Sequence, residues 1–591
     1  GFAKYSKKSA EEARVLIIKQ LKKNGFLKKE EEIENNLSIC YRCDTAIEPL
    51  PSKQWFVDVD KKLKRLGNKS LKEKAIEVAK KGEIKFIPDR FSKRYFDWME
   101  NLRDWCISRQ IWFGHRIPVW YRGGDIHVGD KPDGVEWVQD EDSLDTWFSA
   151  GMWTFSTLGW PENFKDGKKT GDLLKYHPTQ VLETGYEILT LWVSRMIMMT
   201  LFAVGEIPFV NVYLHGMVLD KNGKKMSKSK GNGIDPIDMI EKFGTDAVRL
   251  SLLIGNTPGN DVRLSEEKIA GFRNFANKLW NISRFILSVI ASEATRPPCF
   301  ARRSGRERSE GSFTKKMDPS VVPLPRDDKL TLADKWILNR LNEVTKIVTE
   351  NIENYNFSYA GEILRDFTWS ELADWYLEIA KIESGKVEIL NYILNTILKL
   401  WHPFMPFVTE QIWCEFYGKD KMLMIESWPQ FIILNEESLK QFTLIKNIIT
   451  NIRSLRADYK IDPVKKLNAA ISAGKKSALL KENEAVIKCL ARLEKIKIDS
   501  KIIKSKNSIG FVESGVEVYI DTEGVIDVEK EKSRLEKEIV EIEKYASDLE
   551  KKLANKEFIK NAPKEVVEKE KVKFAEAKIK LEKLQQQLSN L

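Results

Sequence analysis

Four lysines and two serines crowd into nine residues near the middle of the chain, and no other segment is better suited to chemistry. Residues 224–232 read Lys-Lys-Met-Ser-Lys-Ser-Lys-Gly-Asn. The apolar run from Phe209 to Leu214 predicts a buried strand before this loop, and Asp235-Pro236 predicts a capped helix start after it. Backbone N–H groups, hydroxyls and ammonium groups between a strand end and a helix start can hold a polyphosphate. A solvated basic loop is the plain alternative.

Within this loop, Lys225-Met226-Ser227-Lys228-Ser229 is the signature of class I aminoacyl-tRNA synthetases. Together with the preceding Leu214-His215-Gly216, it resembles the valyl-tRNA synthetases most closely. The resemblance implies that Lys225 and Lys228 are catalytic, with Lys228 nearest the leaving pyrophosphate, and that His215 and Gly216 face adenine through backbone groups. The ATP-binding residues implied in this way are His215, Gly216, Lys225, Met226, Ser227, Lys228 and Ser229.

Two other segments carry residues that the resemblance places around the amino acid. Residues 140–145 hold four acids, which by themselves indicate a solvated turn. Residues 181–196 predict a strand, a glycine turn and a helix, in which Ile188 and Trp192 share one face. Ordinary core packing is the alternative for that pair. The resemblance assigns to an apolar amino-acid pocket, suited to a branched aliphatic side chain, the residues Asp145, Trp147, Ile188 and Trp192.

The reaction that the resemblance implies has two steps and requires no protein nucleophile. The carboxylate of L-valine attacks the α-phosphate of ATP, and a terminal ribose hydroxyl of tRNA(Val) then takes the valyl group. ATP with Mg²⁺ is a substrate, so no dedicated metal site is expected. Cys40 and Cys43 form half of a zinc knuckle, but a structural zinc site needs four ligands and no cysteine pair follows Pro118–Tyr121. Two reduced cysteines are therefore favoured over zinc.

The family's second ATP motif, two histidines close together, is not found in this sequence. No two of the five histidines lie within four residues of each other: His115, His127, His177, His215 and His402. Only the tail of the family's editing insertion is recognisable. We therefore expect the chain to correspond to a valyl-tRNA synthetase without its N-terminal part. It should be inactive alone, and a separate N-terminal half is a candidate partner.

Composition excludes some classes of protein and favours others. At 591 residues the chain is too long for one core, and we expect about three to five domains. The formal net charge of +10 suits a polyanionic partner. The six cysteines form no disulfide framework, which favours a reducing cytoplasm. No stretch reads as membrane-spanning and no signal peptide is visible, so we expect a cytoplasmic protein, monomeric and without a membrane partner.

The predicted fold class is the second half of a Rossmann-like α/β catalytic core, followed by an all-α anticodon-binding bundle and a C-terminal antiparallel coiled-coil hairpin. The expected domains are the tail of the editing insertion (1–45), the catalytic half (46–264), the first helix of the helical half (265–294), a disordered basic linker (295–325), the anticodon-binding domain (326–460), a small α/β connector (461–524) and the tRNA-binding arm (525–591).

Periodicity supports the helical parts independently of the resemblance. Apolar residues spaced by three and four predict buried stripes at Ile337, Leu341, Val344 and Val348, and at Leu535, Ile539, Ile542, Ala546, Leu549 and Leu553. A second heptad run starts at Phe574, and Pro563 between the two runs favours a hairpin over a dimerisation zipper. Arg453, Arg456 and Lys460 are either phosphate contacts or solvated surface.

Two alternatives stay open at this point. The chain could be an isoleucyl-type synthetase, although the coiled-coil hairpin and the lack of cysteine pairs after residue 489 argue against this. It could also be a tRNA-binding module without catalysis. The lysine–serine loop and the two pocket segments argue against a pure binding module, since such a module has no need of them.

Overall fold

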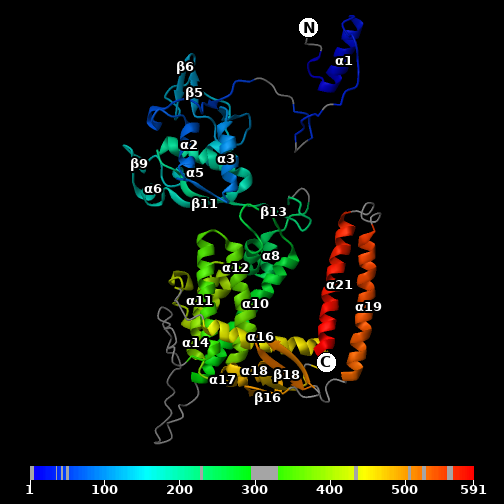
Figure 1. The fold of residues 1–591 in the computed structure, drawn as a ribbon. Helices are drawn as coiled ribbons and strands as arrows, with labels where there is room; N and C mark the ends of the chain where they lie inside the picture. Colours follow the sequence, from blue (N-terminus) through cyan, green and yellow to red (C-terminus); the bar gives the residue numbers. More distant parts are fainter. Residues whose placement is uncertain are drawn as a thin grey trace, which may run out of the picture. The chain divides into compact units, whose positions relative to one another are not determined.

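The computed structural model describes residues 5–34, 36–40, 44–47, 52–226, 231–294, 330–430, 437–462, 464–503, 508–521, 528–555 and 564–590 (Figure 1). Ser227, Lys228, Ser229, Cys43 and the predicted linker 295–325 lie outside these residues. The chain divides into two compact units, one formed by residues 1–61 and 102–150 and the other by 62–101 and 151–591.

Among its described residues, the first unit has short antiparallel strand pairings and two helices. Its helix α1 (Ala10–Lys23) begins at a capping box between Ser9 and Glu12, and none of its residues is buried. Strand β1 (Phe56–Val57) pairs with β3 (Trp105–Cys106), and β4 (Ser108–Arg109) pairs with β8 (Ser143–Leu144). A three-stranded sheet has β5 (Val119–Arg122) between β6 (Asp125–Val128) and β7 (Val138–Gln139). The short helix α4 (Thr146–Gly151) closes this part of the chain.

The second unit begins with a parallel sheet of three strands in the order β11-β12-β2. These are β2 (Lys85–Ile87), β11 (Thr179–Gly185) and β12 (Phe209–His215). Phe209, Val212 and Leu214 are fully buried, which confirms the predicted buried strand. Around the sheet lie η2 (Lys64–Leu66), α2 (Leu71–Lys80), α3 (Arg90–Glu100), α5 (Trp153–Ser156), α6 (Gly171–Tyr176) and α7 (Ser194–Ala203), with the hairpin β9 (Phe164–Lys165) and β10 (Lys168–Lys169).

Segment Tyr186–Ala203, which includes α7, is apolar enough to cross a membrane by length and composition, with a mean hydropathy of 1.2 over 18 residues. The segment is not an unbroken apolar run, because it contains Glu187 and Arg195, and 56% of it is buried inside the protein. A core helix and a membrane span pass the same hydropathy test.

His177 is a buried histidine just before β11, and within the described part of the chain neither ring nitrogen has a hydrogen-bond partner. Burial lowers its pKa below the usual 6.5, the Lys169 ammonium lowers it further, and Glu206 opposes both. His177 therefore binds a proton less readily in the folded protein than in the unfolded chain.

We expect the stability of the second unit to fall as the pH drops below about 6.5, because the unfolded state then takes up a proton at His177 first. Urea unfolding at several pH values should show a shallower acid slope in His177→Leu than in the parent chain. The two proteins should run in parallel above pH 8, and an unchanged slope in the variant would assign the effect to other groups.

The segment after β12 forms a compact subdomain that leads into the helical half. It contains β13 (Val218–Leu219), α8 (Pro236–Phe243), α9 (Thr245–Leu253), β14 (Val262–Arg263) and the long helix α10 (Glu266–Ala294). Asp235 caps α8 as predicted, since its carboxylate accepts from Ile237 N–H at 2.8 Å. Burial raises the pKa of Asp246 on α9, whose carboxylate accepts from the Val408 N–H at 2.7 Å and so ties this subdomain to the bundle.

The predicted helical bundle is confirmed. It comprises α11 (Leu332–Glu353), α12 (Phe357–Asp366), the π-helix η8 (Phe367–Tyr376), α13 (Leu377–Ala380), α14 (Val387–Trp401), α15 (Pro406–Tyr417), η9 (Leu423–Ile425) and α16 (Glu437–Asp458) (Figure 1). The predicted stripe at Ile337, Leu341, Val344 and Val348 is buried throughout. Helix α10 packs against α14 and α15, which joins it to the same core.

The predicted α/β connector contains a four-stranded sheet in the order β16-β15-β18-β17. Its elements are β15 (Leu467–Ser472), η10 (Gly474–Lys476), α17 (Ser477–Glu482), α18 (Glu484–Leu490), β16 (Leu493–Asp499), β17 (Ser508–Glu513) and β18 (Val516–Asp521). Arg456 is folded into this junction, only 7% exposed, and donates to the Lys465 carbonyl at 2.6 Å. Arg453 donates to the Leu490 carbonyl at 2.9 Å. Arg456 is buried in the junction, so the expectation of a solvated surface position was wrong for Arg456, whereas Arg453 is exposed. Phosphate contacts by these arginines remain a prediction.

The last two helices, α19 (Val528–Ala554) and α21 (Lys564–Asn590), lie side by side as the predicted hairpin (Figure 1). Their direction is antiparallel, because Lys552 donates to Glu570 and Gln585 donates to Glu543. Leu535, Ile539, Ala546 and Leu549 are buried at the predicted heptad positions. The breaker at Pro563 lies outside the described residues.

Candidate active site

The carboxyl ends of β11 and β12 form the edge at which ATP is expected. Gly185 and His215 stand opposite each other in the parallel register. In open α/β sheets, ligands bind beyond the carboxyl ends of the strands. His215 Nδ1 lies 2.7 Å from the Gly216 carbonyl oxygen, and its Nε2 lies 3.3 Å from Glu183 Oε1. The imidazole therefore lies at this edge. That His215 faces adenine through backbone groups remains a prediction.

Gly216 packs so closely against a neighbouring loop that no larger residue fits at this position. A Cβ at this position would lie 1.8 Å from the Asn260 carbonyl oxygen. The next residue of that loop, Asp261, accepts from the Met217 N–H at 2.8 Å and from the Tyr186 hydroxyl at 3.1 Å. Burial and the Asp261 carboxylate raise the pKa of Tyr186. The 260–261 loop thus locks the first residues after β12.

Asp220 closes the stem of the lysine–serine loop. Its Oδ1 accepts from the Lys224 N–H at 2.8 Å and from the Asn222 N–H at 2.9 Å. On the far side of the loop, Asn232 Nδ2 donates to Asp220 Oδ2 at 2.9 Å and to the Lys225 carbonyl at 3.3 Å. The Lys224 N–H, followed by the Asn232 amide, holds the pKa of Asp220 below its usual 3.8. Asp220 and Asn232 therefore join the two ends of the loop.

We expect Asp220→Ala to loosen this loop, because two backbone N–H groups and one side-chain amide lose their acceptor. Amide hydrogen exchange of Asn222 and Lys224 should become faster, while exchange in the β11-β12 sheet stays the same. Asp220→Asn keeps one acceptor oxygen and should show an intermediate effect. Unchanged exchange in Asp220→Ala would show that other contacts hold the loop.

Lys225 and Met226 are the two signature residues that the structure describes. Lys225 is exposed, and its Nζ lies 3.6 Å from Glu187 Oε2. Met226 is half-buried against a small apolar cluster that includes Met239, Val248 and Leu264. The methionine thus anchors the loop, while the Lys225 side chain is exposed. The expected roles of Ser227, Lys228 and Ser229 remain predictions.

Asp145 and Trp147 belong to the first unit, where Asp145 is a buried acceptor rather than part of a solvated turn. Its Oδ2 accepts from Trp105 Nε1 at 3.1 Å and lies 3.0 Å from Arg109 Nη2. Its Oδ1 accepts from the Trp147 N–H at 3.4 Å. The carboxylate therefore fixes the backbone that carries the half-buried Trp147 side chain.

Asp140 serves the same unit in a similar way. Its Oδ2 accepts from Trp55 Nε1 at 2.9 Å and from the Tyr121 hydroxyl at 2.8 Å. Burial raises the pKa of Asp140, but the hydrogen bonds from Trp55 and from the Asp142 N–H outweigh it, and the net pKa is lowered from 3.8. The reading of this acidic run as a solvated turn was therefore wrong for Asp140 and Asp145.

Ile188 and Trp192 belong to the second unit, and both are half-buried. The chain here forms a 3-10 turn, η3 (Tyr186–Ile188), and then a π-helical turn, η4 (Leu189–Val193). The predicted α-helix is therefore replaced at these residues by a 3-10 turn and a π-helical turn. That the two side chains share one face remains a prediction. The Trp192 ring lies 6.1 Å from the Trp153 ring.

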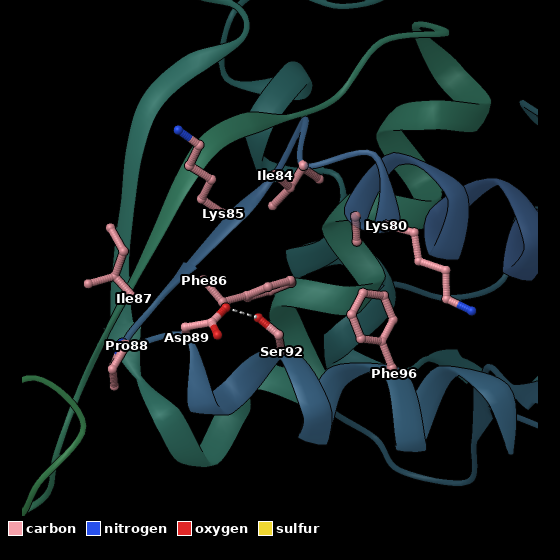
Figure 2. Close-up of a pocket in the computed structure, with 11 residues that line it drawn as sticks. Lys80, Ile84, Lys85, Phe86, Ile87, Pro88, Asp89, Ser92 and Phe96 are labelled. Atoms are coloured by element: carbon pink, nitrogen blue, oxygen red, sulfur yellow. Dashed lines mark hydrogen bonds between the residues drawn. The ribbon is translucent and has the colours of Figure 1, made fainter.

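A cavity of about 580 Å³ lies beside β2, between that strand and helices α2 and α3 (Figure 2). Its walls are largely apolar, and Figure 2 shows Ser92 donating to Asp89 at its rim, at 3.1 Å. None of the predicted site residues lines it. Among the described residues, no group of three or more His, Cys, Asp or Glu side chains is arranged to hold a metal ion.

Comparison with known families assigns the parts of the chain. The family described as "tRNA synthetases class I (I, L, M and V)" matches residues 7–140 and 125–265, and "Anticodon-binding domain of tRNA ligase" matches 334–471. "Valyl tRNA synthetase tRNA binding arm" matches 527–591. Among curated proteins, the Clostridium tetani "Valine--tRNA ligase" is 42% identical over 100% of this chain and 64% of its own length. The chain belongs to the valine–tRNA ligase family.

Other relatives of the valine–tRNA ligase family agree. The Carboxydothermus hydrogenoformans protein is 41% identical over 98% of this chain. This chain spans about 64% of the length of each of these two relatives. The family assignment confirms the predicted fold class, and the isoleucyl-type alternative drops out. A solved structure of Mycobacterium tuberculosis methionyl-tRNA synthetase aligns with 66% of this chain and 67% of its own, at 18% identity and a TM-score of 0.46, which is too low to carry an argument.

The residues that sequence reasoning missed are the anchors of the valine–tRNA ligase loop. They are Glu183, Glu187, Asp220, Asn232 and Asp261. Asp220 lies four residues before Lys224 and Asn232 lies two residues after Lys230, so a search for a polar pair on either side of the lysine run would have found them. Asp261 lies far along the chain, and only the fold brings it to Met217.

Proposed function

We propose that this chain carries the lysine–serine loop, the amino-acid pocket and the tRNA-binding parts of a valine–tRNA ligase. Such an enzyme attaches L-valine to tRNA(Val) through valyl-adenylate. The observation that supports this most directly is the loop stem, closed by Asp220 and Asn232 at the sheet edge where His215 and Gly216 also lie. Such a stem presents lysines to a triphosphate without fixing their side chains.

In the proposed first step, a carboxylate oxygen of valine forms a bond to the α-phosphorus of ATP. The bond from that phosphorus to the bridging oxygen breaks, and pyrophosphate leaves with its electron pair. Charge grows on the leaving group, so preorganised cations lower the barrier. Lys225 and Lys228 supply this charge, and Mg²⁺ on the phosphates needs no protein cage. In the second step, a terminal ribose hydroxyl of the tRNA attacks the valyl carbonyl and AMP leaves.

The amino-acid pocket is proposed from Asp145, Trp147, Ile188 and Trp192. Asp145 acts by holding the Trp147 backbone, through a carboxylate that Trp105 and Arg109 fix from the other side. The remaining three side chains are apolar and half-buried, which suits an aliphatic group. Transfer of a valine side chain out of water supplies the binding energy at such a site.

The partners proposed from the family are tRNA(Val), L-valine and ATP. The proposed location is the cytoplasm, and the proposed oligomeric state is a monomer. The bundle of α11 to α16 would hold the anticodon arm, and the hairpin of α19 and α21 would brace the tRNA. Exposed lysines on the hairpin suit salt-dependent contacts with phosphates.

The test separates tRNA binding from catalysis. The chain should bind a tRNA(Val) transcript, but valine-dependent exchange of pyrophosphate into ATP should be absent, because no close histidine pair is present in the sequence. A chimera of this chain with the part of the Clostridium tetani relative that it does not span should restore exchange. Exchange by the chain alone would overturn the expected inactivity, and a folded chimera without exchange would contradict the proposed chemistry.

A further inference from the structure

Strands β11 and β12 stop pairing just before the two segments proposed to face the substrates. The described parallel ladder ends at the pair Gly185 and His215. Beyond it, β11 continues into η3, which contains Ile188 of the proposed amino-acid pocket. Strand β12 continues into Gly216 and Met217 at the proposed ATP edge. The position of one segment relative to the other therefore depends on contacts other than the strand pairing.

A single carboxylate oxygen bridges these two segments. Asp261 Oδ1 accepts from the Tyr186 hydroxyl at 3.1 Å and from the Met217 N–H at 2.8 Å. Tyr186 is the first residue of η3, and Met217 is the second residue after β12. Because both hydrogen bonds end on one atom, η3 cannot shift relative to the end of β12 without lengthening one of them, and hydrogen bonds weaken steeply as their geometry worsens.

The loop that carries Asp261 is held in turn by the start of helix α3. Arg90 donates to the Gly259 carbonyl at 2.7 Å and to Asn260 Oδ1 at 2.8 Å. Gly259 has a φ of 75°, and a Cβ at this position would lie 2.6 Å from the Phe91 ring. The loop is therefore packed tightly against α3, and Asp261 extends from a fixed backbone.

The Tyr186 ring is supported separately from its hydroxyl. It stacks on Phe91, with ring centroids 5.5 Å apart and an interplanar angle of 18°. Phe91 is only 9% exposed and follows Arg90 directly, so the same turn of α3 supports both the tyrosine and the Asp261 loop. A phenylalanine at position 186 would keep this stacking and lose only the hydrogen bond, which makes the contribution of the hydroxyl separable.

From this arrangement we infer that Asp261 is a positioning residue for adenylate formation, which holds the amino-acid pocket in place relative to the ATP edge. It acts through Tyr186 and Met217 rather than by touching the reacting atoms. This role rests on the proposed function, because it concerns the approach of the valine carboxylate to the α-phosphate of ATP. Reacting atoms must lie about 3–3.5 Å apart, and a misplacement of about 1 Å costs about 10²-fold in rate.

The bridge is tested first in the full chain, with Asp261→Ala. Amide hydrogen exchange should become faster both at Met217 and in η3, while exchange within β11 and β12 stays the same. The melting temperature should stay within about 2 °C of the parent, because Asp261 is exposed. Faster exchange at Met217 without any change in η3 would show that the carboxylate does not join the two segments, and would overturn the inference.

The kinetic test uses the chimera with the Clostridium tetani part. Asp261→Ala should lower the maximal rate of valine-dependent pyrophosphate exchange by about 10- to 100-fold. The apparent KM values for valine and ATP should stay within about threefold of the parent, because each substrate keeps its own contacts. Asp261→Asn keeps one acceptor oxygen and should lose less rate than Asp261→Ala. Tyr186→Phe should also lower the maximal rate, and adding it to Asp261→Ala should cost nothing further, since the bridge is already broken.

Tyr176→Phe is the matched control, because it removes an exposed hydroxyl from α6 and should leave exchange within about twofold of the parent. A parental maximal rate in Asp261→Ala would overturn the positioning role. A raised KM for ATP in place of a lower maximal rate would make Asp261 a direct substrate contact and overturn it too, as would additive losses from Asp261→Ala and Tyr186→Phe. A parent chimera without exchange would instead overturn the proposed function, and the positioning role with it.

Discussion

Replacing Lys386 with methionine should lower the free energy of unfolding of the helical bundle by about 3–5 kcal/mol. Lys386 and Asp334 are 2% and 1% exposed. The Lys386 ammonium donates to both Asp334 carboxylate oxygens at 2.7 Å and to Thr331 Oγ1 at 3.0 Å. Methionine keeps the packing volume but leaves the aspartate charge buried without its cation, and this uncompensated charge is the source of the cost.

The remaining hydrogen-bond donors around Asp334 cannot replace the lost Lys386 ammonium. The Tyr376 hydroxyl donates to Asp334 Oδ1 at 2.6 Å, and the Thr331 N–H donates to Oδ2 at 2.9 Å. Burial, together with the Asp334 charge, raises the pKa of Tyr376 well above its usual value of 10, so the tyrosine stays a neutral donor. Two neutral donors stabilise a carboxylate less than a buried ammonium does.

The measurement is urea unfolding, followed by hydrogen exchange of the α11 and α14 amides so that the bundle is observed separately from other parts. Lys346→Met is the matched control, since Lys346 lies on α11 in an exposed pair with Glu350 at 4.0 Å and should change stability by less than about 0.5 kcal/mol. Adding Asp334→Asn to Lys386→Met should recover part of the loss. A loss below about 1 kcal/mol in Lys386→Met would contradict the prediction that an uncompensated buried charge destabilises the bundle.

Periodicity predicted the hairpin well but failed at Glu570, a charged core position. The apolar run of the second helix was read from Phe574, yet the heptad continues backward to Glu570 and Val567. Glu570 is 7% exposed because Lys552 and Lys573 donate to its carboxylate at 3.1 and 2.9 Å. A count of apolar residues cannot find a core position filled by a paired charge. Buried leucine and isoleucine positions can be predicted from the periodicity of one helix, whereas burial of Glu570 depends on Lys552 on the other helix.

The same distinction separates the predicted and the missed parts of the site. His215, Gly216, Lys225 and Met226 belong to one local motif, and a local motif can be read from the sequence. Asp261, in the loop before β14, accepts a hydrogen bond from the Met217 N–H, next to that motif. Arg456 donates to the Lys465 carbonyl because the chain reverses direction after α16, and the local sequence does not predict this reversal. The π-turn at Leu189–Val193 is a third case, because apolar spacing does not distinguish one helix period from another over so few residues.

Lys228→Ala should lower valine-dependent pyrophosphate exchange in the chimera by about 10²–10³-fold, which is the effect of removing one preorganised group that stabilises developing charge. The loss should appear in the maximal rate rather than in the apparent affinity for valine, because the leaving pyrophosphate gains its charge only in the transition state. Lys225→Ala should show a smaller loss, since Lys225 lies 3.6 Å from the Glu187 carboxylate and shares its charge with it.

Lys221→Ala is the matched control for both lysine variants, because Lys221 is exposed at the start of the same loop but outside the signature. It should exchange pyrophosphate within about twofold of the parent, as expected for a surface substitution away from the reacting groups. The lysine variants should also bind tRNA(Val) like the parent, which separates chemistry from docking. If Lys228→Ala kept more than about a tenth of the parental rate, the cationic loop would bind substrate without stabilising the departing pyrophosphate.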